Sequence, residues 1–294
     1  MNSITGIILA ISLFIIMTGM GLSLTIFDFK RVVQYPKAII IGLCSQLLLL
    51  PIIGFCIAYF FDLSSVIAIG IMLIASCPGG ATSNMISYLA KGDLALSVSL
   101  TAIASLLSFL TIPFIMNIGF DVFLDESQAM KLDFMATLKQ LFVIIIIPVL
   151  IGMFINRKYP EFAFKVEKPV KKASMVLFIL VVVGVTYSNR NEFVAYFSQA
   201  GWPSILLNIS TMLAGYLLAI IFRLPRNQAV TISIESGIQN GTLAITIATL
   251  ILQKPEYTIV PLTYGLLMFF TAAVIIAFRK RAKESEIITS DKNL

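Results

Sequence analysis

Apolar runs of about twenty residues recur along the whole 294-residue chain, and only 12% of its residues are charged. A soluble domain carries roughly 25% charged residues, so this composition is typical of a membrane protein. In the hydrocarbon core every backbone N–H and C=O needs a partner within the protein, which leaves helices and closed barrels. Runs of this length match membrane helices rather than barrel strands of about ten alternating residues, so the sequence predicts an all-α polytopic membrane protein.

Hydropathy divides the chain into about nine predicted spans, which form a single transmembrane domain of residues 1–281. The polar residues 282–294 are predicted to form a disordered cytoplasmic tail. The longest predicted loops, near 119–135 and 157–171, are too short to hold a soluble domain. The predicted spans are 4–24, 38–60, 66–90, 94–118, 136–156, 172–188, 203–222, 228–252 and 258–278.

Lysine and arginine are distributed unevenly over the two sides of this topology. One side holds only Lys131, Lys139, Arg190 and Lys254, and the other holds the remaining 17 of the 21 basic residues. Because cytoplasmic loops are enriched in basic residues, we predict a cytoplasmic C-terminus and an outside N-terminus in the cell (inner or plasma) membrane. Topology thereby explains the net charge of +6, and the predicted surroundings are the lipid bilayer, with no nucleic acid and no obligate protein partner.

Several kinds of chemistry are excluded by what the sequence lacks. It contains no histidine, which removes histidine-based catalysis and most zinc sites. Its cysteines, Cys44, Cys56 and Cys77, lie in predicted spans without a CxxC or metal-ligand spacing. The HExxH, GxSxG and P-loop motifs are also absent, so the sequence indicates that the protein is not an enzyme.

Two predicted spans contain residues that interrupt a helix. Pro78-Gly79-Gly80 stands within span 66–90, where proline removes a helical hydrogen bond and the glycines weaken the helix. Glu235-Ser236-Gly237-Ile238-Gln239-Asn240-Gly241 stands within span 228–252. Irregular backbone at membrane depth is tolerated only where protein buries it or it lines a cavity. Because the two spans run in opposite directions, they are typical of an inverted-repeat transporter with two crossing discontinuous helices.

Glu235 is the one acidic residue predicted deep within a span, with no lysine or arginine at the same depth. A lone carboxylate near the bilayer centre costs on the order of a few kcal/mol, so it must be protonated or meet a cation. Intramembrane hydroxyl and amide oxygens favour a hard monovalent cation such as Na⁺, and Ser97 and Thr101 share one helix face. The predicted oxygen donors are Ser83, Asn84, Ser97, Thr101, Gln46 and Gln239.

The helix that resumes after Gly80 is expected to begin near Thr82. Its first N–H groups have no partner within the helix, and the positive end of the helix dipole lies there. Such an end is a ready anion site, and a substrate carboxylate fits it.

The interrupted segments resemble the signature segments of the bile acid:sodium symporter family, in its nine-span, bacterial-type form. The resemblance covers nearly the whole chain, including span order and spacing. The matching segments are Pro78-Gly79-Gly80-Ala81-Thr82-Ser83-Asn84, Ala95-Leu96-Ser97-Val98-Ser99-Leu100-Thr101 and Glu235-Ser236-Gly237-Ile238-Gln239-Asn240.

The resemblance implies two co-transported sodium ions beside the crossing of the discontinuous helices. One sodium site would use Ser83, Asn84, Ser97, Thr101 and Glu235. The other would use Gln46, Glu235, Gln239 and the backbone carbonyls of Ser236 and Ile238. The substrate would lie against Asn240, Ala81 and Thr82.

The resemblance also implies a core domain that moves against a panel domain. The core would comprise spans 38–60, 66–90, 94–118, 203–222, 228–252 and 258–278, and the panel would comprise spans 4–24, 136–156 and 172–188. Two departures from the family pattern stand near the expected substrate site. Ala81-Thr82 reverses a Thr-Ala pair, and Phe269-Phe270 replaces a polar pair that some bacterial relatives carry.

Together these features predict a secondary active transporter that couples Na⁺ to the symport of a small organic anion, either a carboxylate or a bile-acid-like molecule, by alternating access. The alternative is a proton-coupled or uncoupled organic-anion carrier or exporter of the same architecture, in which Glu235 carries a proton. A continuous channel is less compatible with a buried carboxylate among broken helices than alternating access is.

Overall fold

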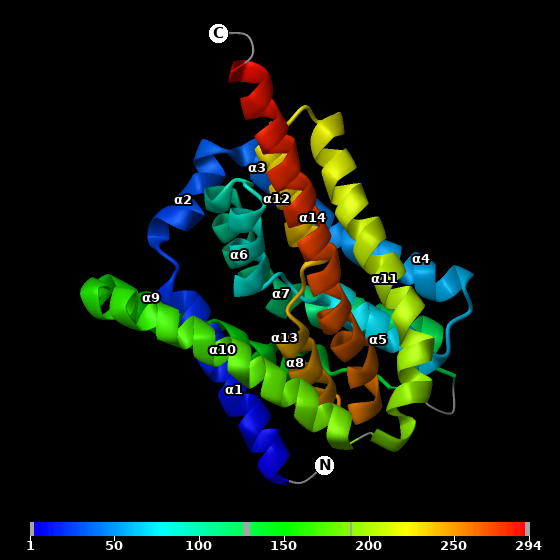
Figure 1. Ribbon diagram of the computed structural model, residues 1–294. Helices are drawn as coiled ribbons and strands as arrows, with labels where there is room; N and C mark the ends of the chain where they lie inside the picture. Colours follow the sequence, from blue (N-terminus) through cyan, green and yellow to red (C-terminus); the bar gives the residue numbers. More distant parts are fainter. Residues whose placement is uncertain (1–2, 126–129, 189, 292–294) are drawn as a thin grey trace.

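A computed structural model describes residues 3–125, 130–188 and 190–291, which fold into helices joined by short connections (Figure 1). The sequence prediction of an all-α chain is thereby confirmed for the described residues. The helices are α1 (Ser3–Leu22), α2 (Ile26–Gln34), α3 (Pro36–Cys44), α4 (Leu50–Phe60), α5 (Ser65–Ser76), α6 (Ala81–Leu89), α7 (Leu94–Phe123), α8 (Phe134–Leu141), α9 (Ile147–Lys158), α10 (Pro160–Ser188), α11 (Arg190–Ile221), α12 (Arg226–Gly237), α13 (Gly241–Thr246) and α14 (Ile259–Asp291).

Single π-helical turns continue three of these helices at Ser45–Leu49, Phe142–Ile146 and Ile247–Ile251, and a 3₁₀ turn at Pro255–Thr258 precedes α14. Such turns insert one extra residue into a helix and are frequent at functional sites. The first of them contains Gln46, one of the predicted sodium ligands.

Five helical segments of the described residues are long and apolar enough to cross a membrane, and α1 with α2, bent by 61°, would make a sixth. They are Pro36–Phe60, Leu94–Phe123, Phe134–Lys158, Phe197–Ile221 and Pro255–Arg279. Two further apolar helices, Ser65–Ser76 and Gly241–Ile251, are too short to cross alone because each is one part of an interrupted pair. The structure therefore supports a multi-pass membrane protein, while the count of nine spans stays a prediction.

Four segments differ from the sequence predictions. Residues 190–202, predicted to connect two spans, are helical because α11 begins at Arg190. The predicted loop 157–171 is largely helical, because α10 begins at Pro160, and proline is favoured in the first turn of a helix. The predicted disordered tail is helical through Asp291, since Ala282, Lys283 and Glu284 are strong helix formers. Hydropathy also missed α2, a short amphipathic helix with apolar residues on one side and Asp28, Lys30 and Arg31 among the others. Each difference arises because hydropathy measures apolar content and does not register helices that continue into water.

Helix α2 is held against α7 by polar contacts. Asp28 accepts hydrogen bonds from the backbone N–H and the hydroxyl of Thr25, each at 2.7 Å, which closes the first turn of α2. Arg31 pairs with Asp28 at 3.2 Å and also donates to the carbonyl oxygen of Ala95 at 3.1 Å. The connection between α1 and α3 is therefore fastened to the beginning of α7.

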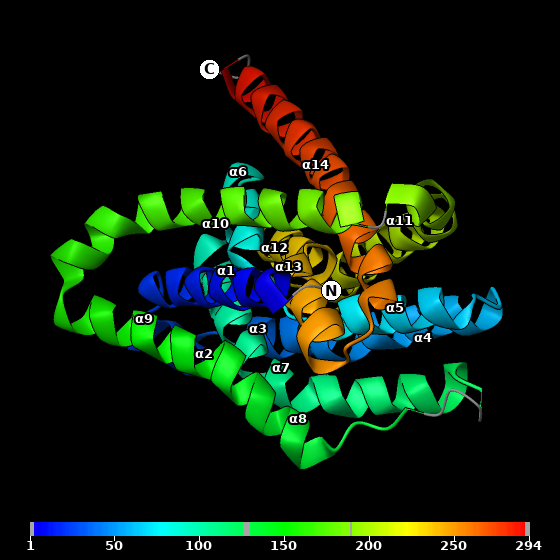
Figure 2. The same ribbon diagram turned by 90° about the horizontal axis from the view of Figure 1, so that it is seen from below.

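The two interrupted pairs lie at the centre of the molecule. Residues 67–76 of α5 and 229–237 of α12 are buried without exception, and α7, α11 and α14 pack around them. In the view of Figure 2, α12 and α13 lie in the middle, while α1, α9 and α10 extend to one side. The C-terminal part of α14 projects from the body in both views (Figures 1 and 2).

Helices α1 and α9 approach each other closely where Gly21 meets Gly152. A Cβ at Gly152 would lie 2.7 Å from backbone atoms of Gly21 and Leu22, and a Cβ at Gly21 would meet the backbone of Val149. Small residues that let two backbones approach in this way are typical of membrane helix interfaces.

We expect Gly152→Ala to destabilise the protein by about 1–3 kcal/mol, because the added methyl group has no space between two backbones. The measurement is the thermal unfolding midpoint of the purified protein in detergent. Gly201→Ala in α11 is the matched control, since nothing lies within 4 Å of a Cβ there. Equal midpoints for the two variants would contradict the close packing of α1 on α9.

Candidate functional site

The breaks in the two interrupted pairs lie side by side. Gly79 and Gln239 form an isolated antiparallel bridge, and the N–H of Asn240 donates to the carbonyl oxygen of Pro78 at 2.9 Å. The chain breaks where the sequence predicts it, since α5 ends at Ser76 and α12 ends at Gly237. Each linker thus supplies partners for backbone groups that the other leaves without a helical bond.

The carboxylate of Glu235 points from the last turn of α12 toward α7. Its Oε1 accepts a hydrogen bond from Ser97 at 2.5 Å, and its Oε2 accepts one from Thr101 at 2.8 Å. Only 1% of the residue is exposed, and it makes no ion pair with any described residue. Ser97 and Thr101 stand one helical turn apart, which lets both hydroxyls reach the same carboxylate.

Asn84 and Ser83 of α6 complete this cluster. The side-chain oxygen of Asn84 accepts from Ser97 at 2.8 Å and from Thr101 at 3.3 Å. The hydroxyl of Ser83 lies 3.3 Å from that of Thr101 and donates to the carbonyl oxygen of Gly80 at 2.7 Å. Five predicted residues from three separate helices are therefore brought together.

This cluster contains more acceptor oxygens than hydrogens to satisfy them. A serine or threonine hydroxyl carries one hydrogen, whereas a carboxylate oxygen or an amide oxygen only accepts. The hydroxyls of Ser97 and Thr101 together face both oxygens of Glu235 and the side-chain oxygen of Asn84. With Glu235 ionised, this hydrogen-poor oxygen cluster is chemically suited to a hard cation, because it has no ion pair to any described residue.

Gln46 and Gln239 form a second group beside the end of α12. The amide nitrogen of Gln46 donates to the carbonyl oxygen of Glu235 at 3.3 Å. That of Gln239 donates to the carbonyl oxygens of Glu235 and Ser236, at 3.2 and 2.8 Å. The side-chain oxygens of both glutamines are buried without a hydrogen-bond partner. Such unpartnered buried acceptors are rare and call for a ligand or an ion.

Ser236 and Ile238 lie at the same helix end. Ile238 is fully buried and directly follows Gly237, the last residue of α12, as its C-terminal cap. The hydroxyl of Ser236 lies 2.7 Å from that of Ser45, in the π-helical turn that also carries Gln46. The C-terminal carbonyls of α12 and the turn of Gln46 are thus fastened together.

Gly79 allows the two groups to approach each other. A Cβ on Gly79 would lie 2.9 Å from Oε2 of Glu235, 3.2 Å from Nε2 of Gln46 and 3.3 Å from the hydroxyl of Ser83. A side chain at this position would therefore press against members of both groups. The absence of a Cβ is what lets the linker pass between them.

The N-terminal ends of α6 and α13 meet at the same crossing. No side chain caps α6, which begins at Ala81 as predicted to within one residue. The side-chain oxygen of Asn240 caps α13 by accepting from the N–H of Leu243 at 3.0 Å. Ala81 and Thr82 are partly exposed, while Asn240 is 8% exposed and lies beside Gly80. These residues border the uncapped helix end, where the sequence predicts the anion.

Phe269 and Phe270 lie on different sides of α14. Phe269 is partly buried against the main hydrophobic core. Phe270 is 71% exposed and lines a groove between α11 and α14. The described structure therefore places only the first of this pair in the protein interior.

Sequence reasoning missed two residues that hold the end of α12. Asn208 of α11 and Tyr264 of α14 each donate a hydrogen bond of 2.7 Å to the carbonyl oxygen of Gly237. Tyr264 is fully buried, and the hydroxyl also accepts from Asn208 at 3.1 Å. Their polarity within predicted spans was the signal that could have identified them, because polar groups at membrane depth usually face a bundle interior.

Comparison with known proteins gives a consistent family assignment. Residues 10–196, more than half of the chain, match the Sodium Bile acid symporter family. The chain is 30% identical over 285 residues to the human ileal sodium/bile acid cotransporter. This alignment covers 92% of this chain and 78% of the relative. It is 31% identical over 241 residues to the uncharacterized sodium-dependent transporter YocS of Bacillus subtilis (strain 168), covering 82% and 73% of the two chains.

A plant relative extends the range of named activities. The chain is 30% identical over 242 residues to the probable sodium/metabolite cotransporter BASS1, chloroplastic, of Arabidopsis thaliana, covering 81% of this chain and 58% of that protein. The family and these relatives are transporters and not enzymes. On this evidence, the chain belongs to the sodium bile acid symporter family.

Proposed function

We propose that this protein is a secondary active transporter that couples sodium entry to the symport of a small organic anion by alternating access. The observation that carries the proposal is the hydrogen-poor oxygen cluster around Glu235, which is buried and has no ion-pair partner among the described residues. The names of the relatives, which are sodium/bile acid and sodium/metabolite cotransporters, support the same coupling ion.

The first sodium ion would lie among Ser83, Asn84, Ser97, Thr101 and Glu235. Its positive charge would neutralise Glu235 and replace the missing hydrogens of the cluster. Carboxylate, amide and hydroxyl oxygens are the ligands that hard cations take. Because the ligands come from α6, α7 and α12, the ion would also fasten the two interrupted pairs to α7.

The second sodium ion would lie beside Gln46 and Gln239, with Glu235 and the backbone carbonyls of Ser236 and Ile238. Both amides turn their nitrogens toward carbonyl oxygens, and their own side-chain oxygens have no hydrogen-bond partner. A bound ion would allow each amide to turn over, so that amide and carbonyl oxygens converge on it. The negative end of the α12 dipole would add to the attraction.

The substrate carboxylate would bind at the uncapped start of α6, against Ala81, Thr82 and the amide of Asn240. Helix N-termini favour anions, and Thr82 adds a hydroxyl group. Two Na⁺ and the carboxylate of Glu235 leave one positive charge, which a monocarboxylate neutralises. Either a short carboxylate or a bile-acid-like molecule satisfies this requirement.

Alternating access would move a core domain, containing both interrupted pairs, against a panel of α1, α8 with α9, and α10, which hold the predicted spans 4–24, 136–156 and 172–188. We infer an inverted repeat of nine spans, with the N-terminus outside and the C-terminus in the cytoplasm of a cell (inner or plasma) membrane. The close contact of α1 with α9 and the central burial of α5 and α12 support this division into two bodies.

Sodium should stabilise the wild-type protein against heat, and Glu235→Gln should abolish this effect. An ion that binds only the folded state adds about 2.7 kcal/mol at a hundred times its Kd. The measurement is the unfolding midpoint in Na⁺ against K⁺ and choline at equal ionic strength. Glu256→Gln, which neutralises a carboxylate of a partly exposed ion pair, is the matched control and should keep the sodium effect.

If Na⁺ caused no specific shift of the unfolding midpoint over a broad concentration range, the proposal of sodium sites would be contradicted. If the midpoint instead followed pH in the wild type and became independent of pH in Glu235→Gln, the evidence would favour the proton-coupled carrier.

The number of sodium ions follows from the slope of stability against sodium concentration. Above the Kd each bound ion adds about 1.4 kcal/mol per tenfold rise in Na⁺, so two ions should add twice that amount. Gln239→Leu should lower the slope to that of one ion, because it removes an amide of the second group alone. Gln140→Leu, at an exposed position of α8, is the control. A wild-type slope of one ion would contradict the second site.

Transport itself is tested in proteoliposomes that carry an inward sodium gradient. Uptake of a labelled monocarboxylate or of taurocholate should require Na⁺ and be lost in Glu235→Gln. One net positive charge would move inward with two Na⁺ and one monoanion, so an inside-negative potential of 100 mV should add about 2.3 kcal/mol of driving force. Uptake that is equal in K⁺ and Na⁺ would overturn the proposed coupling.

A further inference from the structure

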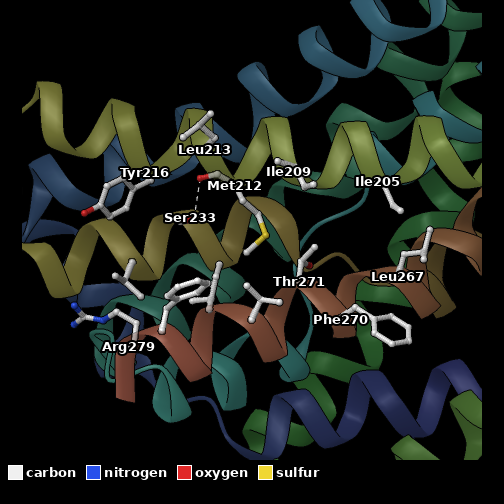
Figure 3. A pocket seen from close by; sticks show the side chains of 14 residues that line it. Ile205, Ile209, Met212, Leu213, Tyr216, Ser233, Leu267, Phe270, Thr271 and Arg279 are labelled. Carbon is white, nitrogen blue, oxygen red and sulfur yellow. Dashed lines mark hydrogen bonds between the residues drawn. The ribbon is translucent and has the colours of Figure 1, made fainter. Parts of the chain in front are cut away.

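A groove of about 930 Å³ lies between α11 and α14 and has α12 as its floor (Figure 3). Its walls are almost entirely apolar. The lining residues include Leu213 of α11 and Phe270 and Val274 of α14. Each of these three side chains is more than half exposed. Its volume is near the upper end of the roughly 300–1,000 Å³ typical of ligand pockets.

The groove is separate from the proposed sodium sites. Ser233 lies in the groove and donates to the carbonyl oxygen of Met212 on α11 at 2.8 Å, whereas Glu235 contacts α7. Two residues along a helix correspond to a rotation of about 200°, so these side chains leave opposite faces of α12. A ligand in the groove would therefore touch α12 on the face that the sodium ions do not use.

The walls of the groove belong to helices that are apolar and long enough to cross a membrane, and the groove is about as long as one leaflet is thick. Its wall residues on α11, from Ile205 to Tyr216, and on α14, from Leu267 to Arg279, belong to two of the long apolar segments. These stretches are about 16–18 Å long at 1.5 Å per residue, while half of the hydrocarbon core is about 15 Å. An extended acyl chain of one leaflet matches this length and the apolar walls.

One end of the groove is polar and positively charged. In Figure 3, Arg279 of α14 and Tyr216 of α11 stand on opposite walls at that end, away from Ile205 and Leu267. Arg279 donates its Nε–H to the carbonyl oxygen of Ala90 at 3.3 Å. It makes no ion pair with any residue whose side chain the structure describes, which leaves out the side chains of residues 280–291. A guanidinium group has five N–H donors, so the others remain available for a phosphate.

We propose that this groove binds an anionic phospholipid from the leaflet on the Arg279 side. One acyl chain lies between α11 and α14, and the phosphate group contacts the guanidinium of Arg279 and the hydroxyl of Tyr216. The lipid bridges two helices that also pack against each other, and Arg279 links its phosphate group to the end of α6 through the hydrogen bond to Ala90. The net negative head group is selected because the groove carries a cation without an acidic partner among the described residues.

The test measures lipid binding to the delipidated full-length protein by native mass spectrometry, with the thermal midpoint as a second measurement. The probes are phosphatidylglycerol, phosphatidylcholine with identical acyl chains, and inorganic phosphate. Phosphatidylglycerol should bind at least tenfold more tightly than phosphatidylcholine and raise the midpoint, and inorganic phosphate alone should have no effect.

Two variants separate the head group from the acyl chain. Arg279→Gln should lower the affinity for phosphatidylglycerol about tenfold to the level of phosphatidylcholine, as expected for the loss of one charge-assisted contact worth about 1.4 kcal/mol. Val274→Trp should reduce binding of both lipids, because the indole fills the groove. Arg157→Gln, an exposed basic residue on α9, is the control and should change neither.

Equal binding of both lipids to the wild type, or unchanged phosphatidylglycerol binding in Arg279→Gln, would overturn the proposal. A midpoint shift from inorganic phosphate that equals the lipid shift would also overturn it, since the acyl chain would then be irrelevant. If the wild-type protein formed dimers and Val274→Trp disrupted them, a second copy of the chain would occupy the groove and the lipid proposal would be overturned. A photoreactive acyl chain that labels the Phe270 peptide in the wild type would support the lipid.

Discussion

The carboxylate of Glu235 is the constraint on which the rest of the arrangement depends. It is 1% exposed and has no ion pair with a described residue. A charge in that position needs polar partners from several directions. Serine and threonine supply them from α7, asparagine from α6, and a glycine leaves the space for their approach. An intact helix would keep its carbonyls bonded within the helix, whereas the breaks leave carbonyls at the helix ends for the proposed cation.

Helix α12 separates two chemically different regions. One face carries the oxygen-rich crossing, and the other forms the floor of an apolar groove. Asn208 and Tyr264 fasten the end of this helix to α11 and α14, which are also the groove walls. The geometry of the carbonyls proposed as sodium ligands therefore depends on the spacing of two helices that contact no sodium. Coupling between the regions would pass through these buried hydrogen bonds rather than through a shared ligand.

Much of the candidate site could be predicted because its signals are local. Proline followed by two glycines breaks a helix regardless of its surroundings, and an acidic residue in an apolar run is conspicuous. The bonds from Asn208 and Tyr264 to Gly237 could not be predicted, since they depend on how α11 and α14 pack against α12. Hydropathy also misplaced the start of α10 and the end of α14, because helices continue beyond the membrane where charged residues have high helix propensity.

The pairing of the two linkers has a consequence for how the protein is made. Pro78 and Asn240, whose backbones are bonded to each other, lie about 160 residues apart in the chain. During synthesis the first broken helix enters the membrane long before the second exists, with backbone groups that lipid cannot satisfy. Until then, water or neighbouring helices must serve as temporary partners. Assembly of the crossing is thus a late step of biogenesis, because the carbonyl oxygen of Pro78 cannot accept its bond from Asn240 until residue 240 has been made.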